Sequence, residues 1–130
     1  MPRSRRSTGE RGSAVVDLVL VLVVLLPLVL GVIQVALVVH VRAALVAAAS
    51  AGARDGAAVG HGPADAVART RELAGGVVSG RALRDVSAAL RTEDGVAVIE
   101  VRVRARISPL GPWAPGLMTT VVAHAVLEGR

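Results

Sequence analysis

The chain of 130 residues contains no cysteine, phenylalanine or tyrosine, and Trp113 is its one aromatic residue. Without thiols it has no disulfides, thiolate metal sites or cysteine nucleophile. With a single aromatic ring, its core has to be built from Val, Leu, Ile and Ala. Lysine is also missing, so that all fifteen basic residues are arginine. We interpret this as a mark of codon usage rather than of a binding site.

Motifs for catalysis and metal binding are missing from the sequence as well. It has no nucleophile elbow, phosphate-binding loop or paired carboxylates. His40, His61 and His124 lie far apart, without the short spacing of metal ligands. We therefore expect no enzymatic activity, no metal and no cofactor.

The net charge of +5 is distributed unevenly. Residues 1–12 hold four arginines and one glutamate, for a charge of +3, which leaves +2 for the rest of the chain. Most of the charge thus lies in a basic leader, which argues against a nucleic-acid-binding face. Arg102, Arg104 and Arg106 alternate along a later segment. Because aromatic side chains for stacking are missing, we interpret that strand face as solvated rather than as a site for an anion or polymer.

One long apolar run, from Val15 to Val39, dominates the chain. About 20 apolar residues cross the ~30 Å hydrocarbon core of a bilayer as a helix, so the run predicts a membrane span. Four arginines precede the run, whereas the fifteen residues after it contain only two arginines, Arg42 and Arg54. The positive-inside rule then places the N-terminus in the cytoplasm and the C-terminal part outside. We expect a single-pass protein of the cell (inner) membrane.

A cleaved signal peptide is the alternative interpretation of this run. Ala47-Ala48-Ala49 and Ala49-Ser50-Ala51 have small residues at the spacing of a cleavage site. Signal peptides, however, have an apolar region of only about 7–15 residues. A soluble module released near Ala51 would appear in the medium.

The start of the run carries a recognisable motif. Residues 11–17 read RGSAVVD, with a glycine at the edge of the run and an acid five residues later. This resembles the processing site of type IV pilin-like precursors, which a membrane aspartyl peptidase cuts after the glycine. Together with the run and a later GAR, it resembles TadE-like minor pilins of the Tad (Flp) pilus system. The matching residues are Gly12, Ser13, Gly31 and Gly52-Ala53-Arg54.

The chain departs from this family pattern at three positions. Asp17 stands where glutamate is usual, Gln34 stands at the second acidic position, and Pro27 comes a turn later than in the family. Gln34 is expected to hydrogen-bond a neighbouring helix. Pro27 removes one backbone hydrogen bond and is expected to kink the helix.

The resemblance implies a set of partners and a processing step. The partners are a prepilin-type peptidase, other pilin-like subunits and the pilus assembly machinery, within the lipid bilayer and without nucleic acid. Cleavage after Gly12 would free the amine of Ser13, which could neutralise Asp17 of a neighbouring subunit in the membrane. In the alternative, Asp17 reaches back to the lipid headgroups.

An alanine-rich segment follows the run, and we expect the helix to continue through it to about Asp55. Ala44, Ala48, Gly52 and Gly56 form a stripe of small residues that permits close helix approach. A poorly packed stalk is the alternative. Pro63 then suits the first turn of a second helix, which Gly75-Gly76 would end.

In the last third of the chain, apolar and polar residues alternate as they do in β-strands. Asp94-Gly95 is a two-residue hairpin signal, and a turn there pairs residues whose numbers sum to 189. Leu90 then faces Ile99, and the same register places Ala88 opposite Val101, Val86 opposite Val103, Asp85 opposite Arg104, and Ser87 opposite Arg102. A loop around Trp113 separates this hairpin from a third strand, about Thr119 to Leu127.

These observations predict an α+β protein. A long N-terminal transmembrane helix extends into a stalk and is followed by a short helix and a small three-stranded antiparallel sheet. The predicted domains are a cytoplasmic basic leader (1–12), a transmembrane and stalk helix (13–56) and an extracytoplasmic domain (57–130). The predicted function is that of a TadE-like minor pilin or pseudopilin. The alternative is an uncleaved bitopic anchor whose outer domain binds an envelope partner.

Overall fold

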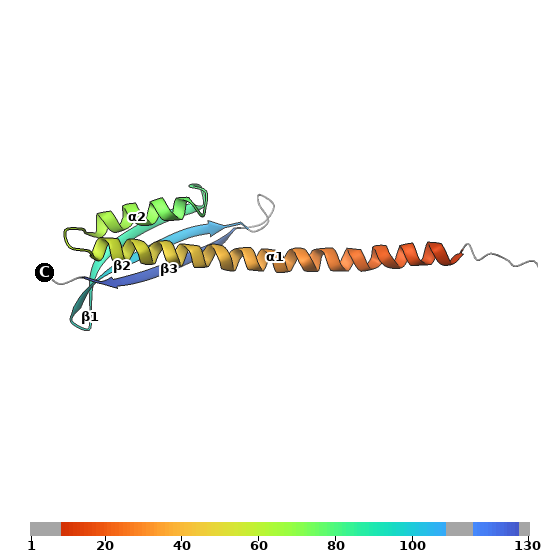
Figure 1. The fold of residues 1–130 in the computed structure, drawn as a ribbon, viewed down its shortest axis with the longest axis horizontal. Coiled ribbons are helices and arrows are strands. Elements are labelled where there is room, and N and C mark those ends of the chain that lie inside the picture. The colour runs from red at the N-terminus through yellow and green to blue at the C-terminus, as the bar shows by residue number, and fades with distance from the viewer. Residues whose placement is uncertain (1–8, 109–115, 128–130) are drawn as a thin grey trace, which may run out of the picture. The chain divides into compact units, whose positions relative to one another are not determined.

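The computed structural model describes residues 9–108 and 116–127. The predictions for residues 1–8 of the leader and for the Trp113 loop lie outside this part of the chain. Its five elements follow one another as α1 (Gly9–Ala57), α2 (Pro63–Gly75), β1 (Leu83–Glu93), β2 (Val96–Ile107) and β3 (Leu117–Val126) (Figure 1). The α+β fold class predicted from the sequence is confirmed.

The chain divides into two compact units, Met1–Val35 and Ala36–Arg130. The described part of the first unit is the N-terminal half of α1, whose large apolar side chains are exposed along its whole length. This helix is long and apolar enough to cross a membrane, and an exposed apolar surface of this kind calls for lipid or partner helices around it. One such helix at this position indicates a single-pass membrane anchor.

The second unit begins within α1 and continues through α2, which has the predicted bounds. Pro63 lies in the first turn of α2, where its missing N–H costs no helical hydrogen bond. The Gly62 N–H donates to Asp65 Oδ2 at 2.9 Å, which fixes the entry into the helix. After Gly75, Val77 and Val78 both donate backbone hydrogen bonds to the Ala74 carbonyl, which closes the helix end.

The three strands form one antiparallel sheet in the order β1-β2-β3. The turn between β1 and β2 is Asp94-Gly95, and both residues have positive φ, 50° and 80°, as a type I′ turn requires. The predicted register is confirmed, since Leu90 pairs with Ile99 and every other predicted pair is present. β3 begins two residues before its predicted start and ends one residue before its predicted end.

The core of the second unit lies between one face of the sheet and the two helices. Ile99, Val101 and Val103 of β2 are fully buried, and so is Leu45 of α1. Alanines supply most of the helical side of this core, at Ala48, Ala49, Ala53, Ala66 and Ala74. Helices covered by such short side chains can pack closely on the sheet. The C-terminal half of α1 therefore belongs to the packed domain.

Candidate functional site

Gly12 and Ser13 lie in the first turns of α1, and the backbone there is helical. A Cβ atom at Gly12 would meet nothing within 4 Å. Packing within this chain therefore gives no reason for a glycine at this position. Ser13 and Asp17 are exposed, and their spacing of four residues places them on the same face of the helix.

Asp17 and Gln34 point to different sides of α1. They are seventeen residues apart, and at ~100° per residue their side chains lie about 100° apart around the helix axis. The two side chains therefore do not both face a single straight helix packed alongside α1. If both residues contact subunits, as the sequence suggests, they contact different ones.

Pro27 lies inside α1, and the helix continues on both sides of it. Proline has no backbone N–H, so it cannot donate to the carbonyl of Val23 one turn earlier. Membrane helices tolerate such a position when a neighbouring group satisfies the carbonyl.

The stripe of small residues contacts α2. A Cβ atom at Gly52 would overlap Thr70 Oγ1 and would lie 2.7 Å from the Ala66 carbonyl oxygen. A Cβ atom at Gly56 would lie 2.6 Å from that of Ala66. Ala48 is buried and Ala44 half-buried. The two glycines of the stripe thus allow α1 and α2 of the same chain to approach each other closely.

The Gly52-Ala53-Arg54 motif combines three environments in consecutive residues. Gly52 faces α2, Ala53 is fully buried in the core, and Arg54 is exposed in the last turn of α1. A cation at this end of a helix interacts favourably with the helix dipole. Thr70, which fills the space beside Gly52, is fully buried, and its hydroxyl donates to the Ala66 carbonyl at 2.7 Å.

The face of the sheet opposite the core carries a charged cluster centred on Glu100. Arg91 Nε and His124 Nε2 each lie 3.2 Å from Glu100 Oε2, and Arg102 Nη2 lies 3.2 Å from Glu100 Oε1. The hydrogen bond from His124, together with the charges of Arg91 and Arg102, holds the pKa of the Glu100 carboxyl below its ordinary value, although partial burial opposes this.

Sequence reasoning missed this Glu100 cluster. It predicted a solvated strand face on which Asp85 lies opposite Arg104. They do face each other in the sheet, but three ion pairs found on this face among the described residues converge on Glu100, and a further one joins His124 to Glu93. The missing signal was the register of β3, which places His124 directly beside Glu100.

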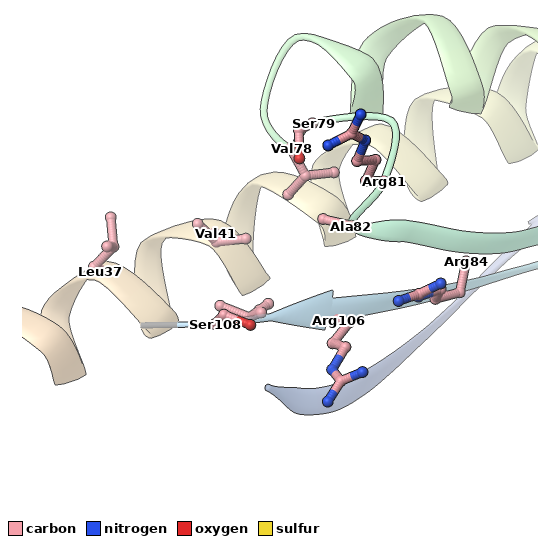
Figure 2. A pocket seen from close by; sticks show the side chains of 10 residues that line it. Leu37, Val41, Val78, Ser79, Arg81, Ala82, Arg84, Arg106 and Ser108 are labelled. Carbon is pink, nitrogen blue, oxygen red and sulfur yellow. The ribbon is translucent and has the colours of Figure 1, made fainter. Parts of the chain in front are cut away.

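The second unit also has an open pocket of about 550 Å³. Its wall comes from α1, from the segment between α2 and β1, from the start of β1 and from the end of β2 (Figure 2). Its charged lining residues are Arg81, Arg84 and Arg106. Its other lining residues are Leu37, Val41, Val78, Ser79, Ala82, Ile107 and Ser108.

Metal-ligating side chains do not gather in the described ranges 9–108 and 116–127, where no group of three histidines or carboxylates could hold an ion. In that part of the chain His124 faces the two carboxylates of Glu93 and Glu100, but arginines share the same site.

Part of the chain is similar to a known protein family. Residues 12–54 match the sequence model of the family described as TadE-like protein, which confirms over this segment the resemblance predicted from the sequence. The match begins at Gly12 and ends at Arg54, so it covers the apolar helix and its packed C-terminal part. Neither the curated proteins nor the solved structures give a match.

Proposed function

We propose that this chain, which is TadE-like over residues 12–54 and thereby associated with the Tad pilus system, is a membrane-anchored minor pilin or pseudopilin. It would act in assembly of a Tad-type pilus or a related secretion apparatus, through subunit contacts rather than catalysis. The observation that carries the proposal is the coincidence of the family match with the exposed apolar helix α1. The match starts at the glycine that precedes the proposed cleavage site.

The proposed processing step explains why a glycine stands at position 12. Open space surrounds its Cα, so a larger residue would fit the fold, and recognition by a prepilin-type peptidase supplies the constraint that packing does not. Cleavage there would give Ser13 a free amine, and such an amine is largely charged at neutral pH.

The new amine would then meet an intramembrane acid. A carboxylate at the centre of a membrane helix costs about 2.5–3.5 kcal/mol, and less near the interface. Because Ser13 and Asp17 share one face of α1, the amine of one subunit and the carboxylate of the next can pair when two helices lie side by side with a small stagger. That pairing would offset the cost of Asp17 and fix the stagger.

The proposed topology has the leader in the cytoplasm and residues 57–130 outside the cell membrane. A cut near Ala51, as for a secreted module, would remove Leu45, Ala48 and Ala49, which are buried in the core. That loss of core packing favours an anchor that stays attached to its domain.

Intact mass spectrometry of the protein extracted from membranes tests the proposal. Loss of residues 1–12 from the wild type, and retention of the full chain in Gly12→Leu, would support processing at this site. Gly31→Ala is the control, since a Cβ at Gly31 also meets open space, and this variant should be cut normally. A full-length wild-type chain in cells that assemble the pilus would overturn the proposal in favour of an uncleaved anchor that binds an envelope partner.

A further inference from the structure

The strand order β1-β2-β3 makes β1 and β3 the two edges of the sheet. An edge strand presents unpaired backbone N–H and C=O groups that another strand can bind, and natural proteins commonly block such an edge with charged residues, proline or a bulge. The sequence of β3, Leu117–Val126, contains no charged residue and no proline, and its pairing with β2 is regular. β3 is therefore an unblocked edge.

The edge formed by β1 is blocked in several ways. Arg71 of α2 reaches this edge, where its Nη2 donates to the Val86 carbonyl at 3.5 Å. The pairing of β1 with β2 is irregular between Leu83 and Asp85. The two edges of the sheet thus differ, and the difference points to β3 as the edge that takes a partner strand. Four charged residues also lie along β1, namely Arg84, Asp85, Arg91 and Glu93.

The register of β3 shows which of its backbone groups face outward. The Leu127 N–H donates to the Ala97 carbonyl at 3.0 Å, so the odd-numbered residues of β3 exchange hydrogen bonds with β2. Because bonded positions alternate in an antiparallel ladder, the even-numbered residues direct their N–H and C=O groups to the free edge. Within residues 9–108 and 116–127, no hydrogen bond to these outward groups is found. The residues concerned are Met118, Thr120, Val122, His124 and Val126.

The side chains of these even-numbered residues lie on the sheet face opposite the core. Val121 and Ala123 between them are buried in the core, and successive side chains of a strand point to opposite faces. Met118 is 60% exposed, Val122 41% and Val126 61%. The free edge of β3 thus combines unpaired backbone groups with exposed apolar side chains, which a partner strand could cover.

We propose that β3 pairs antiparallel with β3 of a second copy of this chain, across a twofold axis at Val122. The two sheets would then join into one sheet of six strands. In the register that uses the full strand, Met118 lies opposite Val126 of the second copy, Thr120 lies opposite its His124, and Val122 lies opposite its own counterpart. Each bonded pair exchanges two backbone hydrogen bonds, for about ten in all.

The second copy is the occupant because β3 complements itself. A twofold interface needs a surface that fits its own copy, and this register places apolar side chains against apolar ones without bringing two charges of one sign together. Within the described chain the other edge strand is β1, whose edge Arg71 already covers. Two copies that cross one membrane in the same sense can share this axis when it lies along the bilayer normal.

Cysteine crosslinking of the full-length chain in detergent tests the pairing, since the chain has no cysteine of its own. Bonded residues of an antiparallel pair have Cα atoms about 5.5 Å apart, within the range of a disulfide. We expect Val122→Cys to give a disulfide-linked dimer under mild oxidation. Ser87→Cys is the matched control, because Ser87 is exposed on the same sheet face but lies on β1, and it should stay monomeric.

A second pair of positions tests the register. Met118→Cys and Val126→Cys should each stay monomeric alone and should crosslink when the two variants are mixed, because the register places each residue opposite the other. Crosslinking of Met118→Cys with itself to the same extent as in the mixture would overturn the proposal. Equal crosslinking of Val122→Cys and Ser87→Cys would overturn it as well, since contact through α1 or random collision then explains the dimer.

A charge placed on the axis provides an independent test. Val122→Lys, introduced into the mixture of Met118→Cys and Val126→Cys, puts two lysines opposite each other and should lower crosslinking by at least about tenfold. Ser87→Lys adds the same charge to the other edge strand and should leave crosslinking unchanged. Circular dichroism melting of both lysine variants shows whether the fold is kept. Undiminished crosslinking in a folded Val122→Lys chain would overturn the proposal.

This inference goes beyond the proposed function and involves the second unit alone. A chain that keeps residues 1–12 would defeat the proposed processing step and leave the crosslinks at β3 as expected. Conversely, a chain that is cleaved after Gly12 but forms no crosslink at Val122→Cys would defeat only the pairing of β3.

Discussion

Thr70 of α2 occupies the space that a side chain at Gly52 of α1 would need. Its hydroxyl oxygen would overlap a Cβ atom built on Gly52, and the same hydroxyl donates to the Ala66 carbonyl. Both residues are buried, so neither helix has room to give way without disturbing the alanine-rich core around them. The close approach of α1 and α2 therefore depends on this pair.

Gly52→Ala should destabilise the second unit by about 1–3 kcal/mol, because an added methyl group in a packed interface forces the helices apart. For a domain of this size each kcal/mol lowers Tm by about 4–8 °C, which circular dichroism of the chain in detergent would detect. Gly75→Ala is the control, since a Cβ there meets nothing within 4 Å.

Combining Gly52→Ala with Thr70→Ala tests the contact itself. Removing the Thr70 hydroxyl relieves the shortest contact of the new methyl group, whereas the contact of 2.7 Å with the Ala66 carbonyl oxygen remains. The double variant should therefore be more stable than the sum of the two single effects predicts, but less stable than the wild type. Strict additivity would mean that Gly52 is required for another reason.

Glu100 should make the free energy of unfolding of the domain depend on pH in the acidic range. Its carboxyl pKa is lowered in the folded state, first by the hydrogen bond from His124 and then by Arg91 and Arg102. A group with a depressed pKa stabilises the fold above its unfolded-state pKa, near ~4.3 for glutamate, and this stability is lost as the pH falls through the folded-state value.

The measurement for Glu100 is the free energy of unfolding between about pH 6 and pH 3. The wild type should lose more stability over this range than Glu100→Gln, which has no carboxyl to protonate. Glu72→Gln removes one carboxyl from an exposed ion pair on α2 and serves as the charge-matched control. Parallel pH curves for wild type and Glu100→Gln would contradict the assignment.

The parts of this fold that the sequence predicts are those specified by nearby residues. The β1–β2 register follows from Asp94-Gly95 and from the alternation on either side of it, because a two-residue turn fixes the pairing. The bounds of α2 follow from Pro63 and Gly75 for the same local reason. The apolar run is recognisable from its length alone.

What the sequence could not specify depends on contacts between distant segments. The stripe through Gly52 and Gly56 signals a close approach, but α2 as the partner emerges only once the fold is known. The Glu100 cluster requires the register of β3, and the arginine-lined pocket requires segments that are as much as seventy residues apart, such as Leu37 and Arg106. Pairing of this kind leaves no local pattern in a single sequence.

Leu90 and Ile99 offer a test of where the core ends. They face each other across β1 and β2, yet Ile99 is 1% exposed and Leu90 is 58% exposed. Ile99→Ala should cost about 2–5 kcal/mol, whereas Leu90→Ala should cost well under about 1 kcal/mol. Thermal unfolding of both variants gives the comparison. Similar losses would mean that a partner covers Leu90 under the conditions of the experiment.

Asp17 provides the test closest to the proposed function. Asp17→Asn keeps the shape of the side chain and removes its charge, so a neighbouring Ser13 amine would lose its partner in the membrane. A contact worth about 1.4 kcal/mol corresponds to a factor of about ten in an equilibrium. We therefore expect surface pili, collected by shearing, to fall by about tenfold or more, while membrane insertion and cleavage after Gly12 continue.

Two further variants show whether the missing charge of Asp17 causes the expected loss of pili. Asp17→Glu keeps the carboxylate and should assemble near the wild-type level. Gln34→Leu changes a different side of α1, so its effect should add to that of Asp17→Asn instead of duplicating it. Normal pili from a correctly cleaved Asp17→Asn chain would mean that the carboxylate reaches the lipid headgroups and has no role between subunits.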